Sequence, residues 1–290
     1  MARARGVAAA TCSTDRTPLS AQASGLLGPA AIRELAQQLD LRPTKTLGQN
    51  FLHDANTIRR IVRTAGVGPD DVVLEIGPGL GVLTRYLADR VAYVHAAEVD
   101  RRLEEHVAGI DRTTVHWGDA LELDVRALEP PPQKLVANLP YNIATPIVAE
   151  SLSVEQLVLW CVMVQREVAD RFFAKPSTKA YGAVSVLVQL ATERTGFHPV
   201  SREVFRPKPN VESALVAFRR TGPGATAETR RVVTASFAHR RKTLANALAL
   251  AGLGSRERAV EALDAIGRPP AIRAEALEPA EFVALEEALR

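Results

Sequence analysis

The nine residues VLEIGPGLG, at positions 73–81, decide the fold of this chain. An apolar run typical of a buried strand leads straight into a glycine-rich turn, and a helical pattern begins near Val82. Glycines let the backbone of such a turn approach a ligand closely, here above all Gly77 and Gly79. The spacing is one residue tighter than the dinucleotide fingerprint and lacks the Lys-Ser/Thr ending of a P-loop. The stretch therefore predicts a strand, a ligand-binding turn and a helix, and leaves the ligand open.

Short apolar runs alternate with helical patterns on the C-terminal side of this turn. They occupy residues 72–76, 93–97, 114–117, 135–137 and 157–164. Strands that alternate with helices predict a mostly parallel sheet covered on both faces. Two later runs, 192–198 and 213–219, flank the Pro-rich stretch 205–210, and we expect them to form an antiparallel hairpin at the sheet edge.

Helical patterns flank the predicted sheet on both sides. Before it we expect a helix over residues 29–39 and a second helix that has Asp54 as its N-cap and ends at Gly66. The apolar face of the second helix is Ile58, Ile61, Val62 and Ala65. Residues 1–28, rich in Ala, Ser, Thr and Gly, predict a disordered extension. The sequence TGPG at 221–224 precedes helical patterns only, so we expect a sheet domain over 29–220 and a small all-α domain over 221–290.

Composition narrows the class of protein. The 290 residues are 47% hydrophobic and carry a net charge of +3, and residues 1–66 hold nine basic against four acidic side chains, which modestly favours an anionic partner. The two cysteines lie far apart in the sequence, Cys12 in a polar leader and Cys161 in an apolar run. This arrangement indicates neither a disulfide framework nor a zinc site. No apolar run is long enough to span a membrane. We expect a cytoplasmic protein with no metal site and no membrane association.

Acidic residues follow the next two predicted strands. Glu98 lies 17 residues beyond Gly81 at a strand end, where a carboxylate can accept hydrogen bonds from both ribose hydroxyls. Asp119 follows the third strand and could accept one from an adenine amino group. Together with the glycine turn these positions trace an adenosine. A nicotinamide dehydrogenase would place a ribose in the same way, and ordinary strand-end polar residues would also fit, so this half of the chain leaves both open.

The fourth strand ends in Asn138-Leu139-Pro140-Tyr141, at the sheet edge where open α/β proteins bind ligands. The exocyclic amine of adenine is a poor nucleophile because its lone pair is delocalised into the ring. Two acceptors, the Asn138 side-chain oxygen and the Leu139 carbonyl, can orient the amine hydrogens. Pro140 stiffens the turn, and Tyr141 offers a face for stacking an extracted base, worth roughly 1–3 kcal/mol.

Methyl transfer from a sulfonium releases a neutral thioether and needs no general acid, so positioning for in-line attack is most of the catalysis. No His, Cys or carboxylate pair is placed for a further role. The motif therefore predicts an S-adenosylmethionine-dependent methyltransferase acting on the adenine amine. The alternative is that these four residues only connect the strand to a turn and take no part in catalysis.

The chain closely resembles the KsgA (RsmA) ribosomal RNA adenine dimethyltransferases, within the wider group that includes the Erm enzymes. The resemblance runs from about Arg42 to the C-terminus. Beyond the glycine turn, Glu98, Asp119 and residues 138–143, the matching motifs are 45–52, 163–169, 181–182, 205–209 and 240–244. His239, where the family more often has Gln, is a small departure.

The resemblance implies a Rossmann-like, seven-stranded methyltransferase domain followed by a small all-α C-terminal domain. It implies that S-adenosylmethionine is bound by residues matching Gln49, Asn50, Leu52, Gly77, Glu98, Asp119 and Asn138. It also implies that Phe205 stacks on the target base opposite Tyr141; a core-filling role is the alternative. We expect Arg240, Arg241 and Lys242, on a helix around 237–248, to contact RNA phosphates, although a solvated helix face would look the same.

The implied reaction places two methyl groups on each of two adjacent adenosines in a hairpin loop near the 3′ end of 16S ribosomal RNA. The implied partner is an immature small ribosomal subunit, and we expect the protein itself to be a monomer. Two alternatives stay open at this point: an Erm-type enzyme that acts on 23S ribosomal RNA, and an assembly factor that keeps the fold without the activity.

Overall fold

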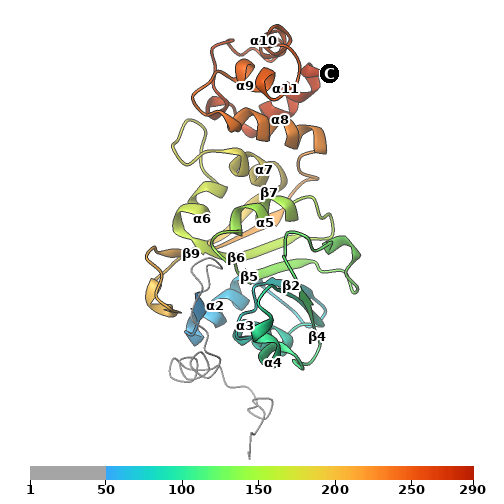
Figure 1. Ribbon diagram of the computed structural model, residues 1–290, viewed down its shortest axis with the longest axis vertical. Coiled ribbons are helices and arrows are strands. Elements are labelled where there is room, and N and C mark those ends of the chain that lie inside the picture. The colour runs from blue at the N-terminus through green and yellow to red at the C-terminus, as the bar shows by residue number, and fades with distance from the viewer. Residues whose placement is uncertain (1–49) are drawn as a thin grey trace, which may run out of the picture.

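The computed structural model describes residues 50–290, which form a sheet domain with a helical segment stacked on one end (Figure 1). The predicted extension 1–28, the predicted helix 29–39 and Gln49 lie outside the described residues. No helix within residues 50–290 is long and apolar enough to cross a membrane.

Seven strands form one mixed sheet in the order β4-β3-β2-β5-β6-β9-β7. Their bounds are β2 Val72–Ile76, β3 Tyr93–Glu98, β4 Thr113–Trp117, β5 Lys134–Asn138, β6 Leu159–Gln165, β7 Thr192–Val200 and β9 Ser213–Arg220. The first five pair in parallel, and β9 lies antiparallel to both β6 and β7. The predicted strands and the edge hairpin are confirmed, and so is the expected fold class, because a helical C-terminal segment follows the sheet.

The strand order places a ligand-binding crevice in the middle of the sheet. The chain builds β2, β3 and β4 outward in one direction, then returns to add β5 and β6 on the other side of β2. At such a switch point the connections leave β2 and β5 in opposite directions, so the carboxyl ends of these two strands border an open crevice. The glycine turn follows β2 and the Asn-Leu-Pro-Tyr motif follows β5, so the fold brings both motifs to this crevice.

Helices cover both faces of the sheet. Their bounds are α2 Ala55–Ala65, α3 Val82–Ala88, α4 Glu104–Val107, α5 Ala144–Ser151, α6 Arg166–Phe172 and α7 Ala183–Ala191, with short 3-10 turns η3 Arg101–Leu103, η4 Val125–Ala127 and η5 Arg202–Val204. Helix α2 begins as predicted, because the Asp54 carboxylate accepts a hydrogen bond from the Thr57 amide at 3.0 Å, and it ends at Gly66, whose φ is +54°. A short pair, β1 (Phe51–Leu52) and β8 (Phe205–Arg206), lies outside the main sheet.

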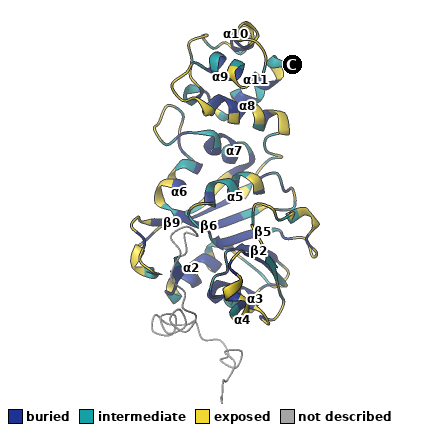
Figure 2. Cartoon of the chain, in the orientation of Figure 1, coloured by how far each residue is buried: buried dark blue, intermediate teal, exposed yellow. Residues whose placement is uncertain are grey.

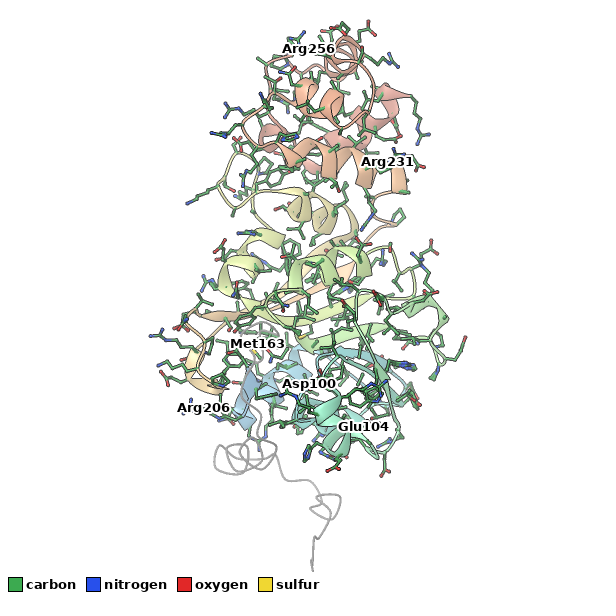
Figure 3. The ribbon with its side chains drawn as sticks, in the orientation of Figure 1. Asp100, Glu104, Met163, Arg206, Arg231 and Arg256 are labelled. Carbon is green, nitrogen blue, oxygen red and sulfur yellow. The ribbon has the colours of Figure 1, made fainter. Side chains whose placement is uncertain are left out.

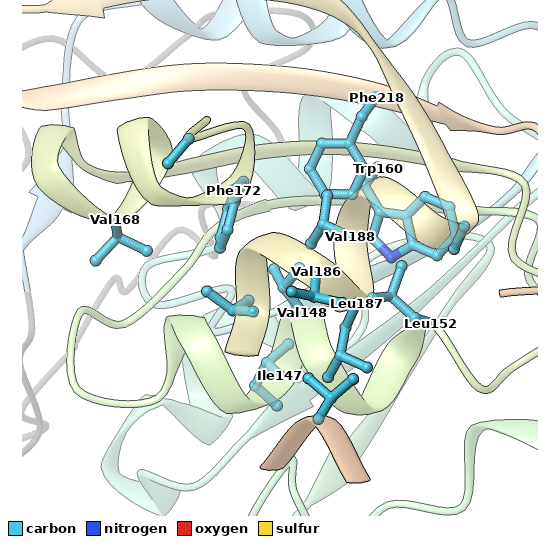
Figure 4. Close-up of a cluster of buried hydrophobic side chains, with 14 of the residues drawn as sticks. Ile147, Val148, Leu152, Trp160, Val168, Phe172, Val186, Leu187, Val188 and Phe218 are labelled. Atoms are coloured by element: carbon cyan, nitrogen blue, oxygen red, sulfur yellow. The ribbon is translucent and has the colours of Figure 1, made fainter. Parts of the chain in front are cut away.

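The apolar core lies in two layers, one on each face of the sheet, and Figure 2 shows the strands buried between them. Side chains alternate along β2, so Leu74 and Ile76 belong to one layer and Val73 to the other. In the layer drawn in Figure 4, the Trp160 and Phe218 rings stack with their centroids 5.4 Å apart. These tightly filled layers hold the strand ends, and therefore the crevice, in place.

The C-terminal segment is helical, as the sequence predicts. It contains α8 Ala227–Ala238, α9 Leu244–Leu250, α10 Arg256–Ala265, η6 Ala274–Ala276 and α11 Pro279–Leu289. Helix α8 packs beside α7, and the buried Tyr181 hydroxyl donates to the Leu277 carbonyl at 2.8 Å. One apolar layer is therefore continuous from the sheet into this segment.

The predicted helix around 237–248 is wrong. Helix α8 ends at Ala238 and α9 begins at Leu244, so Arg240, Arg241 and Lys242 lie in the turn between them. The Lys242 amide donates to the His239 carbonyl at 2.9 Å and the Leu244 amide to the distant Ile272 carbonyl at 2.8 Å. A tertiary hydrogen bond thus takes the place of the helical one, and no local pattern signals it.

Candidate active site

A cavity opens at the carboxyl ends of β2, β3 and β5. It is lined by residues 50–52 before α2, Glu75 and residues 77–80 of the glycine turn, Val82 and Leu83 of α3, Glu98 and Val99 after β3, and residues 138–141 after β5. Of the residues predicted from the sequence, the structure gathers Asn50, Leu52, Gly77, Gly79, Glu98 and the whole Asn-Leu-Pro-Tyr motif around this cavity.

The glycine turn lies so close to Pro140 and Phe51 that a side chain on Gly77 or Gly79 would need these neighbours to shift. Gly77 and Gly79 have φ values of +72° and +56°, in the left-handed region that favours glycine. A Cβ atom on Gly77 would lie 3.2 Å from the Pro140 ring, and one on Gly79 would lie 3.1 Å from the Phe51 ring. Glycine at these positions therefore keeps the floor of the cavity open to a ligand.

Glu98 braces the glycine turn from the neighbouring strand. One carboxylate oxygen accepts from the Gly79 amide at 3.1 Å, and the other accepts from the Val99 and Asp100 amides at 3.0 and 2.9 Å. Burial raises the pKa of Glu98, while these backbone hydrogen bonds oppose the shift. Glu98 therefore lines the cavity in a fixed orientation, as a ribose-binding carboxylate requires.

Asn138 presents an unsatisfied oxygen at the end of β5. Its side-chain nitrogen donates to the Asn50 carbonyl at 3.1 Å. A carbonyl can only accept, so this bond fixes which way the amide points. The other end of the amide, Oδ1, is buried, and no described residue donates to it. A buried acceptor without a donor costs about 1–3 kcal/mol, which a bound N–H group would remove.

Tyr141 lines the cavity with a half-buried ring that is held at its far end. Its hydroxyl is 2.6 Å from the hydroxyl of Ser213, a buried residue at the start of β9. Burial raises the pKa of the Tyr141 hydroxyl, and the hydrogen bond to Ser213 opposes that shift. The phenol therefore stays neutral, and the ring has a defined orientation beside Asn138.

Two of the predicted residues, Asp119 and Phe205, do not line the cavity. Asp119 is exposed, and its carboxylate accepts from the Leu121 amide at 2.9 Å. Phe205 is fully buried in the β1–β8 pair, where it fills the core. Gln49 lies outside the described residues. The roles predicted for these residues toward the cofactor and the base stay predictions.

Seven residues that line the cavity are absent from the set predicted from the sequence: Phe51, Glu75, Pro78, Leu80, Val82, Leu83 and Val99. Glu75 lies within residues 73–81. An ionisable residue in the middle of a buried strand is the sequence signal that could have identified it as a site residue. Val99 is 54% exposed although it is a large apolar residue, but in the sequence it looks like any strand-end valine.

The predicted RNA-binding residues are exposed on the turn after α8. The Arg240 guanidinium contacts the Lys179 carbonyl and the Glu275 carboxylate at 3.3 and 3.4 Å, so part of its charge is offset by Glu275. The first of these contacts also places the loop that carries Lys175 and Lys179 beside this turn, and both lysines are exposed. The surface around this turn therefore carries two basic side chains in addition to the three that were predicted.

The cavity fits S-adenosylmethionine in the chemistry of its donors and acceptors. Glu98 offers a carboxylate suited to ribose hydroxyls, Gly77 and Gly79 leave room for close approach, and Val99 supplies an exposed apolar surface for a flat ring. No group of three or more potential metal ligands occurs among residues 50–290. Sheet order, glycine turn and cavity together define an S-adenosylmethionine-dependent methyltransferase of the Rossmann-like class.

Comparison with known proteins narrows this class to one family. The family model described as ribosomal RNA adenine dimethylase matches residues 41–284. A ribosomal RNA small subunit methyltransferase A from Thermobifida fusca (strain YX) is 46% identical, over 90% of this chain and 96% of that protein. The chain belongs to the ribosomal RNA adenine dimethylase family. This result rules out the nicotinamide dehydrogenase alternative.

Solved structures show the same fold. A dimethyladenosine transferase from Plasmodium falciparum shares the fold with a TM-score of 0.65 and 22% identity, covering 81% of this chain and 95% of that one. The 23S rRNA methyltransferase ErmE aligns with a TM-score of 0.56 and 31% identity, covering 83% of this chain and 99% of that one.

Proposed function

We propose that this protein is the adenine dimethylase of small-subunit ribosomal RNA, which transfers methyl groups from S-adenosylmethionine to the N6 amine of adenosine. The expected product is N6,N6-dimethyladenosine at two adjacent positions in a hairpin loop near the 3′ end of 16S ribosomal RNA. The relatives named for the small subunit are 42–48% identical to this chain. ErmE, which is named for 23S RNA, is 31% identical. The small-subunit substrate is therefore favoured over the Erm-type alternative.

The observation that carries the proposal is the unsatisfied Oδ1 atom of Asn138. The Asn50 carbonyl holds the Asn138 amide so that Oδ1, and not the nitrogen, remains available. An acceptor in this position is suited to an N–H of the adenine amine, and a second acceptor from the Leu139 carbonyl would orient the other hydrogen. Holding both hydrogens favours the geometry in which the nitrogen lone pair is released for attack.

Tyr141 supplies the other half of the base site. An adenosine in structured RNA has to leave its stack before its amine can reach a protein cavity, and a flat aromatic face lowers the cost of that step. The Ser213 hydroxyl holds the Tyr141 ring in place. In the proposal Phe205 covers the opposite face of the base, which requires the β1–β8 pair to move because the Phe205 ring is buried.

The cofactor supplies the methyl group on a sulfonium, and the chain supplies orientation. We assign its ribose to Glu98 and its backbone approach to Gly77 and Gly79, with Asn50, Leu52 and Asn138 completing the site. Asp119 would read the adenine of the cofactor from the loop after β4, and Gln49 would contribute from the adjoining segment. Each methyl group that the amine gains replaces one of its hydrogens, and the released proton can pass to solvent without a side chain of the cavity as an intermediate.

The proposed partner is an immature small ribosomal subunit, bound by a single copy of the chain. We assign the phosphate contacts to Arg240, Arg241 and Lys242 together with Lys175 and Lys179 beside them. Such contacts release counterions, so binding should weaken steeply with salt.

The test is to supply purified small and large ribosomal particles, prepared without this modification, with methyl-labelled S-adenosylmethionine. Label confined to the RNA of the small particle is the expected result. Label confined to the large particle would identify an Erm-type enzyme instead. Binding to the small particle without any label would favour an assembly factor that lacks activity.

A further inference from the structure

The loop that joins α6 to α7, residues 175–182, bonds to the C-terminal helical segment, and we call it the strap. The Ser177 amide donates to the Glu275 carbonyl at 2.7 Å, and the Tyr181 hydroxyl donates to the Leu277 carbonyl at 2.8 Å. Neither bond is needed to form α6 or α7 themselves. In Figure 1 helix α7 lies between the sheet and α8. The strap therefore connects the sheet domain to the helices that follow it.

The backbone of the strap is strained at Ser177. Its φ is +63°, and Arg112 is the only other described residue besides glycine with a positive φ. The left-handed region is unfavourable for a residue that has a Cβ atom, so it persists only where the surrounding structure holds it. The bond from the Ser177 amide to the Glu275 carbonyl is such a contact. The strap thus adopts an unfavourable conformation where it reaches the C-terminal segment.

The other side of the strap is fixed to the sheet domain. The Gln189 side chain of α7 donates to the Ala174 and Phe172 carbonyls at 2.9 and 3.3 Å, just before the strap begins. Helix α6 follows β6 without a break, and β6 pairs with β9 where Ser213 holds the Tyr141 hydroxyl. The strap therefore has a rigid connection to the base site.

The turn after α8, which carries residues 240–242, takes its position from the same contacts. The Leu244 amide at its end donates to the Ile272 carbonyl at 2.8 Å, and Ile272 begins the stretch to which the strap bonds. The Arg240 guanidinium donates to the Lys179 carbonyl of the strap itself at 3.3 Å. The position of the turn relative to the base site therefore depends on the strap.

We propose that the strap sets the distance between this RNA-binding turn and the base site, with Ser177 and Tyr181 as positioning residues for methylation. This inference rests on the proposed function. A small ribosomal particle has to contact the turn and present an adenosine to Tyr141 at the same time, and two sites fixed in advance do not have to be ordered on binding. Because the bound state requires the strapped arrangement, losing one bond of the strap weakens particle binding by at most the equilibrium weight of that bond, about 2–12-fold.

The experiment is transfer of label from S-adenosylmethionine to small ribosomal particles by the full chain, in single turnover over a range of particle concentrations. Tyr181→Phe keeps the ring and removes only the hydroxyl, whereas Ser177→Pro sets φ near about −65° and removes the amide donor. In both variants we expect a higher half-saturating concentration of particles, by about 2–12-fold in Tyr181→Phe. The maximal rate and the binding of S-adenosylhomocysteine should not change, because the base site and the cofactor cavity are intact.

Two variants are matched controls. Ser177→Gly tolerates the positive φ and keeps the amide donor, so it should bind particles as the unmodified protein does. Thr192→Val removes a buried hydroxyl that donates to the Val188 carbonyl at 2.7 Å, which is a bond of the same kind as that of Tyr181 but lies within the sheet domain. Thr192→Val should lower thermal stability and leave the half-saturating concentration unchanged.

The decisive comparison adds Tyr181→Phe to a protein with alanine at residues 240–242. The half-saturating concentration should rise no further than in the alanine variant alone, because the strap acts through this turn. An equal further rise would overturn the proposal, and so would normal particle binding by the alanine variant or by Ser177→Pro that is folded in thermal unfolding.

A lower maximal rate in Tyr181→Phe at an unchanged half-saturating concentration would also overturn the proposal, since it would show that the strap only stabilises the fold. Absence of label on the small particle with the unmodified protein would contradict the proposed function instead, so the two failures are distinguishable.

Discussion

Replacing Asn138 by alanine removes two interactions whose effects can be separated. The Oδ1 acceptor for the adenine amine is lost, and so is the hydrogen bond from the Asn138 nitrogen to the Asn50 carbonyl. Removal of one preorganised polar group that acts on the reacting atoms typically lowers kcat about 10²–10³-fold. The bond to Asn50 is one neutral hydrogen bond, whose loss costs about 0.5–1.5 kcal/mol of the free energy of unfolding. Methylation should therefore fall far more than stability.

The assay is a single-turnover measurement of label transfer to small ribosomal particles, with calorimetric binding of S-adenosylhomocysteine measured on the same preparation. Because Asn138 also lines the cofactor cavity, we expect the affinity for S-adenosylhomocysteine to weaken and still be measurable. Asn246→Ala is the control, since the Asn246 side-chain oxygen accepts from the Arg256 guanidinium at 3.1 Å in the C-terminal helical segment (Figure 3), and this change should not alter the rate. An unchanged rate in Asn138→Ala would refute the assigned role. A rate loss explained entirely by lost cofactor binding would refute the contact with the base.

Three further sets of substitutions test separate parts of the protein. Ser213→Ala removes the hydrogen-bond partner of the Tyr141 hydroxyl, so kcat/KM for the RNA should fall by about 2–12-fold. Tyr141→Phe should give a similar loss, and the double variant should lose no more than either single variant. Additive losses would show that Ser213 does not act through Tyr141. Gly79→Ala and Gly66→Ala each place alanine at a positive φ and should each cost about 1–2 kcal/mol of the free energy of unfolding. Only Gly79→Ala should also weaken S-adenosylhomocysteine binding, because only there does the new Cβ meet a neighbour, and equal binding in both would contradict the close approach. Changing residues 240–242 to alanine should lower the slope of log affinity against log salt for the small particle by about 2–3 and leave cofactor binding intact; an unchanged slope would place the phosphate contacts elsewhere.

The strands of the sheet could be predicted from the sequence because the signals for a strand are local. Most of the predicted strands are short, mainly apolar runs, with the largely polar segment 192–198 as an exception, and each was confirmed. Helix α2 was predicted with its N-cap, its apolar face and its stop, since Asp54 and Gly66 act on backbone groups a few residues away. The cavity followed from topology, because parallel strand ends meet at one edge.

The features that the sequence did not reveal depend on distant contacts. The break between α8 and α9 comes from a hydrogen bond to Ile272, almost thirty residues away. The burial of Phe205 comes from pairing of β8 with β1, two short segments that have no strand pattern of their own. Glu75 was visible in the quoted stretch, but only the folded structure shows that its carboxyl group lacks a donor and faces the same cavity as Glu98.

The central claim is that the cavity methylates the exocyclic amine of adenine, and the most direct measurement is of the modified nucleoside itself. Small ribosomal particles lacking the modification would be treated with the protein and S-adenosylmethionine, their RNA digested, and the nucleosides identified by mass spectrometry against standards. We predict N6,N6-dimethyladenosine at two residues per particle, and only a small fraction of that amount after treatment with Asn138→Ala for the same short time. Methyl groups found on a ring carbon, a ring nitrogen or a ribose hydroxyl, or on no nucleoside at all, would contradict the account.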